Sequence, residues 1–275
     1  MRHIPFARRA AAALRYALLV LILLAVCFPI VWMLLASFKT QVQIQSTKNL
    51  FVFTPTFRNY PAVFKDYNFF RPILNSFIVA AGSTLIGLLI GLPASYAISR
   101  YRRKTLGMLI LVIRFLPGIT FLIPWFTIFS RIGLIDTYTA LIMSHLLINL
   151  PFIIWLMVPF FDAMPKELEE SARVDGCYTI TSFRRITLPL ASPGIITGSL
   201  LCFVFSWNNF VFSMVLCGGR TKTLPLAVVN CVSYAVRGSG ALMAASVTIT
   251  LPVLLIAFGT QRYIIQGLTA GAVKG

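Results

Sequence analysis

Long apolar stretches separated by short polar ones make up most of this chain. Six of them are predicted to be helices, at residues 14–37, 73–99, 106–130, 138–160, 194–216 and 241–264. A helix needs about 20 mainly apolar residues to cross the hydrocarbon core of a bilayer, and each stretch reaches that length. The pattern therefore predicts an all-α membrane protein with six transmembrane helices.

The composition agrees with this prediction. Only 11% of the residues are charged and 58% are hydrophobic, whereas about 25% of the residues in a typical soluble protein are charged. The net charge of +17 would suit a nucleic-acid-binding protein, in which clustered Lys and Arg neutralise phosphates. Here the basic residues flank the apolar stretches, so we expect membrane lipid, and no nucleic acid, as a partner.

Three arginines precede the first apolar stretch and a fourth, Arg15, lies at its start, as in the charged beginning of a signal peptide. The stretch spans about 24 residues, which is too long for the apolar region of such a peptide, and no A-x-A cleavage site follows it. We therefore expect an uncleaved first span. Residues 1–72 then hold this span and an external loop with short helices, residues 73–264 form a core of five spans, and residues 265–275 form a C-terminal tail.

The distribution of Lys and Arg predicts the orientation, because basic residues gather on the cytoplasmic side of a membrane. With the N-terminus inside, fourteen basic residues lie on the inner side and nine on the outer side. Four of the inner ones fall within residues 100–104. The count places both termini, and the polar segment after the fourth span, in the cytoplasm.

Glycine and proline mark special places in two of the spans. Gly82, Gly87 and Gly91 leave room for close approach of a second helix to the second span. Pro117 and Pro124 lie inside the third span, where proline removes a backbone hydrogen bond and kinks a helix. We expect a tightly packed second span and a kinked third span that still crosses the membrane.

The predicted spans contain no Asp or Glu, and apart from Arg15 and Arg262, which lie next to span ends, Arg114 is their only charged residue. Ion-coupled carriers usually need ionisable side chains within the membrane. For Arg114 we favour snorkelling toward the interface or pairing with a partner over a role in substrate binding. The chain also lacks the phosphate-binding pattern G-x-x-x-x-G-K-[ST], so we do not expect it to be an enzyme that hydrolyses ATP. A transporter of this kind must take its energy from a partner.

The five cysteines of the chain show no C-x-x-C spacing and no neighbouring histidine cluster. Neither a metal site nor a redox motif is therefore expected. Cys217 and Cys231 share one predicted loop. Both a disulfide and two free thiols are compatible with that placement.

Five of the seven acidic residues lie between Asp162 and Asp175. We name residues 162–192 the acidic loop. Pro165 suits the first turn of a helix, and the glutamates that follow it suit the positive end of the helix dipole. Gly176 suits the end of this helix, because glycine adopts positive φ without a penalty.

Apolar residues in the acidic loop predict how its helices pack. Leu168 and Ala172 form a narrow stripe on the first helix. A second helix is expected from about Thr179 to Leu188–Pro189. These features alone favour a compact surface for a partner about as much as an ordinary solvated loop.

The acidic loop also contains a spaced motif: Glu170-Ser171-Ala172, three residues, Gly176, nine residues, and Ile186-Thr187-Leu188-Pro189. This motif resembles the EAA loop of bacterial ABC-importer permeases, with Ser171 in place of the middle alanine. Trp207-Asn208 in the fifth span and the C-terminal sequence are similar to the carbohydrate-uptake branch, in particular to MalG-like permeases. The resemblance covers the whole chain.

The resemblance implies a MetI-like ABC permease fold in the cytoplasmic (inner) membrane of a bacterium. It implies that the acidic loop docks on a dimer of ATPase subunits, which bind the ATP and Mg²⁺, while this chain binds no cofactor. It also implies a homologous second permease and an extracytoplasmic substrate-binding protein as partners. The residues expected to couple to the ATPase are Glu170, Ser171, Ala172, Asp175, Gly176, Ile186, Leu188 and Pro189.

Two further groups of residues follow from the same resemblance. Thr269, Gly271 and Lys274 belong to a tail expected to contact the ATPases. Gly218, Gly219, Arg220 and Lys222 lie in a loop expected to contact the binding protein.

The expected cargo is a sugar, a polyol or a sugar derivative, neutral or anionic. Sugar recognition needs side chains that pair with hydroxyls and an aromatic face, which Trp207, Asn208, Asn209 and Asn149 offer. Buried amides also bond to neighbouring helices, so a structural role stays open for the asparagines. His145 and Trp125 are expected to be structural. Two alternatives to the importer are a carrier or channel that works without an ATPase, and a membrane scaffold without transport activity.

Overall fold

The computed structural model describes residues 6–234 and 239–270, which contain helices and no strand. Among these residues, four helices are long and apolar enough to cross a membrane. The number rises to as many as six if each of two bent helix pairs is counted as one span. The predicted all-α membrane class is confirmed.

The chain divides into two compact units, the first comprising residues 1–68 and 230–248. Its described helices are α1 (Phe6–Ser37), α2 (Gln41–Gln45), η1 (Thr47–Asn49), α3 (Asn59–Lys65), the end of α13 (Leu224–Tyr234) and the start of α14 (Ser239–Ala270). Short helices therefore follow the first span, as predicted.

A buried lysine organises the first unit. The Lys39 side chain is almost fully buried, and its Nζ donates to the backbone oxygen of Leu50 at 2.6 Å. The ammonium also lies 4.7 Å from the ring centres of both Trp32 and Phe53. Aromatic faces attract cations, so these contacts compensate for the burial of the charge. The amide of Asn59 holds the same segment by donating to the backbone oxygens of Ser37 and Lys39.

The second unit comprises residues 69–229 and 249–275. Its helices are α4 (Phe70–Arg100), α5 (Lys104–Phe115), η2 (Gly118–Phe121), α6 (Leu122–Arg131), α7 (Tyr138–Asp162), α8 (Glu167–Val174), α9 (Thr179–Ser182), η3 (Phe183–Thr187), α10 (Leu188–Leu190), α11 (Ser192–Trp207) and α12 (Val211–Leu216), with most of α13 and the rest of α14. Here η3 is a π-helical turn.

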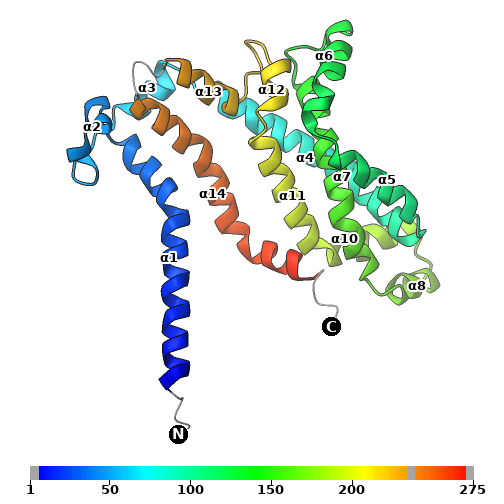
Figure 1. Cartoon of the computed structure of the whole chain (residues 1–275). Coiled ribbons are helices and arrows are strands. Elements are labelled where there is room, and N and C mark those ends of the chain that lie inside the picture. The colour runs from blue at the N-terminus through cyan, green and yellow to red at the C-terminus, as the bar shows by residue number, and fades with distance from the viewer. Residues whose placement is uncertain (1–5, 235–238, 271–275) are drawn as a thin grey trace. The chain divides into compact units, whose positions relative to one another are not determined.

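The core of the second unit forms where α4 packs along α7 and both contact α11 (Figure 1). A Cβ atom at Gly91 would lie 2.7 Å from Cγ2 of Ile153 on α7, which is closer than any side chain allows. The predicted close approach of a helix to the glycine-bearing span is therefore confirmed. It fixes the spacing of α4 and α7, the two helices that carry the sites described below.

The third predicted span is broken more sharply than expected. Residues 105–115 and 118–131 form two helices inclined by 88°. Leu116 is extended (φ −69°, ψ 129°) directly before Pro117. Proline clashes with a helical residue before it, so Leu116 leaves the helical region and the chain changes direction. The expectation of a single kinked helix is wrong for this stretch.

The fifth predicted span also ends early. Helix α11 stops at Trp207 and α12 starts at Val211. The side chain of Asn209 accepts a hydrogen bond from the Phe212 N–H at 3.1 Å. Such a side-chain bond satisfies a free N–H at a helix start and favours a break in the helix. The last helix, α14, continues to Ala270, beyond the end predicted for the sixth span.

Candidate functional site

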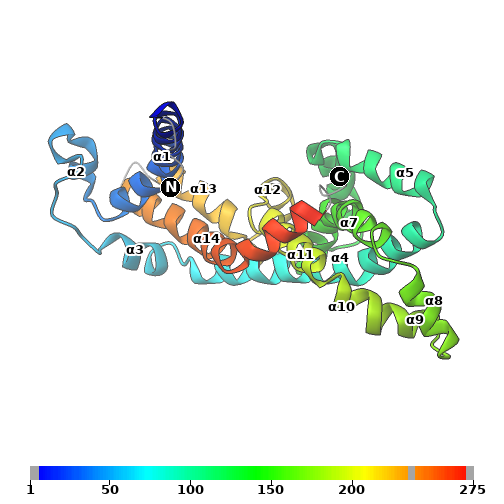
Figure 2. The ribbon, with the colours of Figure 1, turned by 90° about the horizontal axis from the view of Figure 1, so that it is seen from below.

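The acidic loop forms two short helical segments joined by a tight turn. The first segment, α8, begins two residues after Pro165 and is followed by Gly176 at φ +82°. The second begins at Thr179, as predicted, and ends at Leu190, one residue beyond Pro189. In Figure 1 the loop lies beyond the end of α7, at the end of the unit opposite α12, and Figure 2 shows α8, α9 and α10 following one another.

Glu169 on α8 is buried, with 5% of its surface exposed. Its Oε1 accepts hydrogen bonds from Nη2 and Nε of Arg100 at 2.7 and 2.9 Å. Its Oε2 accepts one from the hydroxyl of Tyr96 at 2.7 Å, and Thr187 donates to Oε1 at 3.2 Å. We name these four residues the Glu169 clasp. Glu169 lies in the first turn of α8, as predicted, but the sequence pattern does not predict the contacts of the clasp.

The charge of Glu169 is stabilised despite its burial. Burial by itself would raise the pKa of this carboxyl group, but the hydrogen bonds and the positive charge of Arg100 outweigh it and lower the pKa below its usual value. A lowered pKa adds stability above the unfolded-state value of about 4.3, and this contribution is lost only as the pH falls through the lower folded-state value. The Glu169 carboxylate is therefore charged at neutral pH.

The start of the acidic loop is tied to the end of α4 as well. Arg100 donates from Nη1 to the backbone oxygen of Phe161 at 3.0 Å. Ser99 donates from its hydroxyl to Asp162. Arg100 therefore bonds both to the end of α7 and to α8. The membrane helices and the acidic loop are joined through one guanidinium.

Glu170, the first residue of the spaced motif, is exposed, and no hydrogen bond or ion pair involves its side chain within the described residues. It lines a cavity of about 240 Å³ together with Lys166 and Arg173. The other motif residues lie along the same two segments: Ser171, Asp175, Gly176 and Pro189 are exposed, Ile186 and Leu188 are half-buried, and Ala172 is buried. Leu168, predicted to form an apolar stripe with Ala172, is 45% exposed. The buried pair on α8 is Glu169 and Ala172.

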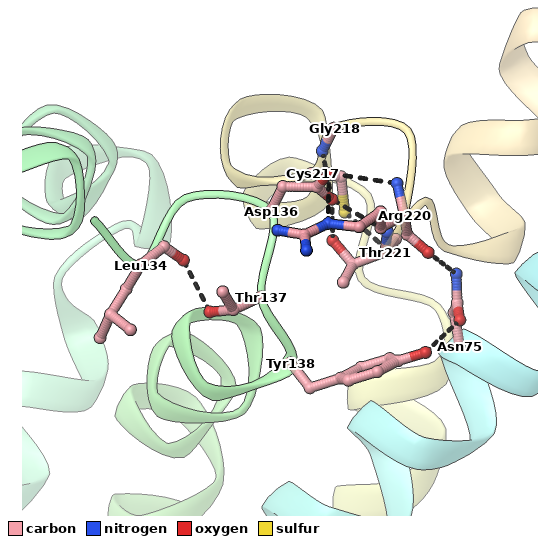
Figure 3. A network of polar contacts seen from close by, with 9 residues as sticks. All are labelled: Asn75, Leu134, Asp136, Thr137, Tyr138, Cys217, Gly218, Arg220 and Thr221. Carbon is pink, nitrogen blue, oxygen red and sulfur yellow. Dashed lines mark hydrogen bonds and ion pairs between the residues drawn. The ribbon is translucent and has the colours of Figure 1, made fainter.

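The loop between α12 and α13 contains Gly218, Gly219, Arg220 and Lys222, and we name it the 217–222 loop. Figure 3 shows it wrapped around the carboxylate of Asp136. Oδ1 accepts hydrogen bonds from the Gly218 N–H at 2.9 Å, the Thr221 N–H at 2.9 Å and the Thr221 hydroxyl at 2.6 Å. Oδ2 accepts one from the Arg220 N–H at 3.1 Å. We name this set of bonds the Asp136 anchor.

A second group holds the same loop from α4 (Figure 3). The Asn75 amide donates to the backbone oxygens of Arg220 at 3.0 Å and Lys222 at 2.9 Å. The hydroxyl of Tyr138, the first residue of α7, donates to Oδ1 of Asn75 at 2.7 Å. The amides of the loop are therefore bound by Asp136 and its carbonyls by Asn75. Neither residue is marked by a motif in the sequence.

The residues proposed to line a substrate path have different surroundings. Trp207 is buried and donates from its indole to the backbone oxygen of Ile249 at 3.1 Å. Asn208 is exposed and Asn209 half-buried, at the break between α11 and α12. Asn149 is buried on α7. Of the four, Asn208 has the most accessible side chain.

Asn149 belongs to a buried polar network between helices. Its amide donates to the hydroxyl of Ser83 at 3.2 Å, and that hydroxyl lies 3.0 Å from the hydroxyl of Ser206. Nδ1 of His145 bonds to the same Ser206 hydroxyl, while its Nε2 is buried without a partner in the described structure. The network joins α4, α7 and α11, which supports the structural role expected for His145. Trp125, also expected to be structural, stacks on Phe129.

Arg114, the C-terminal tail and the cysteines complete the set of predicted residues. The guanidinium of Arg114 lies 4.6 Å from the ring centre of Phe152 and 6.0 Å from that of Phe205. Thr269 lies in the last turn of α14, and Gly271 and Lys274 lie outside the described residues. Cys217 and Cys231 are free thiols. Within the described residues, no group of three or more His, Cys, Asp or Glu is arranged to hold a metal ion.

The sequence matches a family model described as binding-protein-dependent transport system inner membrane component, over residues 83–270. A trehalose transport system permease protein, SugB of Mycobacterium tuberculosis, is 33% identical over 90% of this chain and 92% of its own length. A sulfoquinovosyl glycerol transport system permease protein, SmoH of Agrobacterium fabrum, is 32% identical over 95% of this chain and 94% of its own.

A solved structure has a similar fold. It is a bacterial ABC transporter involved in the import of the acidic polysaccharide alginate, and one of its chains aligns with a TM-score of 0.79. The alignment covers 96% of this chain and 99% of that chain, at 23% identity. The likeness agrees with the permease fold expected from the spaced motif.

Proposed function

We propose that this chain, which belongs to the family of binding-protein-dependent transport system inner membrane components, carries a sugar, a polyol or a sugar derivative across the bacterial cytoplasmic membrane. It is a multi-pass membrane protein and a permease subunit of an ABC importer. The proposed cargo class is supported by the relatives named for trehalose and for sulfoquinovosyl glycerol.

The importer supplies what this chain lacks. The sequence has no phosphate-binding loop, so a dimer of ATPase subunits binds ATP and Mg²⁺ and carries out the hydrolysis. A second, homologous permease completes the membrane part. A substrate-binding protein outside the membrane delivers the cargo, which agrees with the family description.

The observation that carries this proposal is that two neighbouring residues of α8, Glu169 and Glu170, are respectively buried and exposed. Glu169 is buried and tied to Arg100 on α4, so α8 is fixed to the membrane helices. Glu170, the next residue, is exposed beside a cavity lined by Lys166 and Arg173. One face of α8 is thus held by the permease and the other is free for an ATPase subunit.

This arrangement gives the ATPases a way to move the membrane helices. When the ATPase dimer closes around ATP, it shifts α8 through contacts at Glu170. Because the Glu169 clasp connects α8 to Arg100, and Arg100 also bonds to the end of α7, the shift passes to α4 and α7. The change between outward-facing and inward-facing states follows from that movement.

The test compares two charge reversals on α8 in the reconstituted importer. Glu170→Lys should abolish cargo uptake and ATPase binding while the chain still inserts into the membrane. Glu167→Lys, an exposed change of the same charge in the same helix, is the matched control and should keep most of the uptake. Normal uptake by Glu170→Lys would refute the coupling role of Glu170.

A second experiment addresses the cargo. The binding protein that works with this permease is screened against neutral and anionic sugars by its thermal unfolding, because a bound ligand stabilises the folded state. We expect one class of sugar or sugar derivative to raise the unfolding temperature. Stabilisation only by amino acids or inorganic ions would overturn the proposed cargo class.

A further inference from the structure

Side chains from elsewhere in the fold bind five backbone groups of the 217–222 loop. The Asp136 carboxylate accepts hydrogen bonds from the N–H groups of Gly218, Arg220 and Thr221. The Asn75 amide donates to the carbonyl oxygens of Arg220 and Lys222. The backbone oxygen of Leu216, the residue before the loop, accepts a hydrogen bond from the Asp136 N–H at 3.0 Å. Three N–H groups converging on one carboxylate form a strong, charge-assisted anion site. A loop bound in this way has one preferred conformation.

The conformation of Asp136 itself indicates that the anchor is specific. Its φ is +59°, a left-handed conformation that Asp and Asn adopt more readily than most other residues. Its side chain is 18% exposed. Burial would raise the pKa of its carboxyl group, but the hydrogen bonds from Thr221, Arg220 and Gly218 outweigh burial and hold this pKa well below the usual range. The carboxylate is therefore charged whenever the loop is folded.

Gly218 is the complementary feature of the loop. A Cβ atom at this position would lie 2.6 Å from Oδ2 of Asp136. Only glycine lets the backbone come this close to the carboxylate. At the neighbouring Gly219 an added Cβ would meet no atom within 4 Å. The close contact between Asp136 and the loop therefore requires glycine at position 218 but not at position 219.

We infer that Asp136 is the positioning residue that holds the 217–222 loop in a preformed shape for docking of the substrate-binding protein. This inference rests on the proposed function, because it takes that protein as the partner. The side chain of Arg220 is 73% exposed, although its Nε lies 3.6 Å from Oδ2 of Asp136. Its guanidinium is a donor group for acidic or carbonyl groups on the partner.

Helices α4 and α7 connect the 217–222 loop to the acidic loop. Asp136 lies two residues before α7, and Asn75 lies in the second turn of α4. At the far end of α4, Arg100 donates to Glu169 and Ser99 donates to Asp162, the last residue of α7 and the first of the acidic loop. Binding at the 217–222 loop therefore acts on the starts of the helices whose ends reach the ATPase side. A loosened anchor would weaken this link without touching either partner surface.

The test uses trypsin on right-side-out membrane vesicles that contain the complete importer. Trypsin cleaves after Lys and Arg, so Arg220 and Lys222 report directly on opening of the loop. Cleavage tracks the open population when opening is fast relative to cutting. We expect Asp136→Asn, which keeps the tolerance for positive φ but loses the charge, to raise cleavage after Arg220 and Lys222 at least tenfold.

Matched controls separate opening of the loop from general unfolding. Asp66→Asn changes the other acidic residue outside the predicted cytoplasmic regions and should leave cleavage of the loop unchanged. In Asp136→Asn, cleavage after Lys48 and Arg58 should stay at the wild-type rate. Unchanged cleavage after Arg220 and Lys222 in Asp136→Asn would overturn the inference, whatever cargo the importer carries.

A second measurement tests the docking role. In proteoliposomes, Asp136→Asn should raise at least tenfold the concentration of binding protein that gives half-maximal stimulation of ATP hydrolysis. A wild-type stimulation curve together with an opened loop would overturn the docking role. Absence of stimulation in the wild-type importer would refute the proposed function, while the cleavage result would still decide whether Asp136 anchors the loop.

Discussion

The acidic loop and the 217–222 loop lie at opposite ends of α4 and α7, and each is held by one carboxylate. Glu169 is bound by side chains, namely the guanidinium of Arg100 and two hydroxyls. Asp136 is bound mainly by backbone N–H groups. The first anchor therefore depends on the identity of distant residues, and the second depends on the conformation of a short backbone segment.

This difference predicts different sensitivities. At the acidic loop, a change of side-chain chemistry breaks the contact, and a compensating change elsewhere can restore it. At the 217–222 loop, most side chains can change without loss of the anchor, because the backbone supplies the donors. There a glycine is the sensitive position. Protease accessibility at both loops tests this contrast.

The largest effect is expected from Arg100→Glu. The ion pair with Glu169 is buried, with side-chain exposures of 10% and 7%, and removal of one partner of a buried pair costs about 3–5 kcal/mol. Two carboxylates would then repel each other in the same site. We expect loss of uptake and fast tryptic cleavage after Arg173, Arg184 and Arg185 in inside-out vesicles.

The control for this prediction is the reversed pair, Arg100→Glu with Glu169→Arg. A double-mutant cycle isolates the interaction of two residues in contact. The reversed pair should recover slow cleavage and a fraction of the uptake. Wild-type cleavage in the Arg100→Glu single variant would show that the clasp does not hold the acidic loop.

A smaller effect is expected from Gly218→Ala at the other loop. The added Cβ would lie 2.6 Å from Oδ2 of Asp136, and overpacking of this kind costs about 1–3 kcal/mol. Cleavage after Arg220 should rise by about tenfold, since about 1.4 kcal/mol corresponds to a factor of ten. Gly219→Ala is the matched control and should change nothing. Equal cleavage in the two variants would contradict the special role of Gly218.

Tyr138→Phe should have a modest effect. It removes the hydroxyl that donates to Oδ1 of Asn75 at 2.7 Å and leaves the bonds from Asn75 to the loop in place. A single hydrogen bond of this kind contributes about 0.5–1.5 kcal/mol. We expect a several-fold rise in cleavage after Lys222, and a larger rise for Asn75→Ala. A larger effect of Tyr138→Phe than of Asn75→Ala would contradict the proposed order of contacts.

Local pattern predicted the features of the fold that depend on neighbouring residues. Hydropathy placed the apolar helices, Gly91 marked the close contact with Ile153, and Gly176 marked the end of α8. The break at Pro117 was predicted as a kink. Its angle of 88° was not, because it depends on how far Leu116 rotates out of the helical region.

The anchors were missed because their partners are distant in sequence. Leu168 and Ala172 suggested an apolar inner face for α8, yet the surface that α8 contacts is polar, formed by Arg100 and Tyr96. One feature of the sequence indicated this contact: basic residues 100–104 and the acidic loop are both predicted on the cytoplasmic side of the membrane. Asp136 offered a weaker signal, as an isolated acidic residue in a short turn.

The smallest effect on loop structure is expected from Arg220→Ala. Nε of Arg220 lies 3.6 Å from Oδ2 of Asp136, and this side chain is 73% exposed, so the pair contributes about 0–1 kcal/mol. Cleavage after Lys222 should stay within about twofold of wild type, because the Arg220 N–H still binds Asp136. Stimulation by the binding protein should fall, because the exposed guanidinium is removed from the docking surface. Unchanged cleavage with weaker stimulation would show that the backbone holds the loop and that the side chain serves docking. A large rise in cleavage would mean that the Arg220 side chain holds the loop. The contrast with the Glu169 clasp would then disappear.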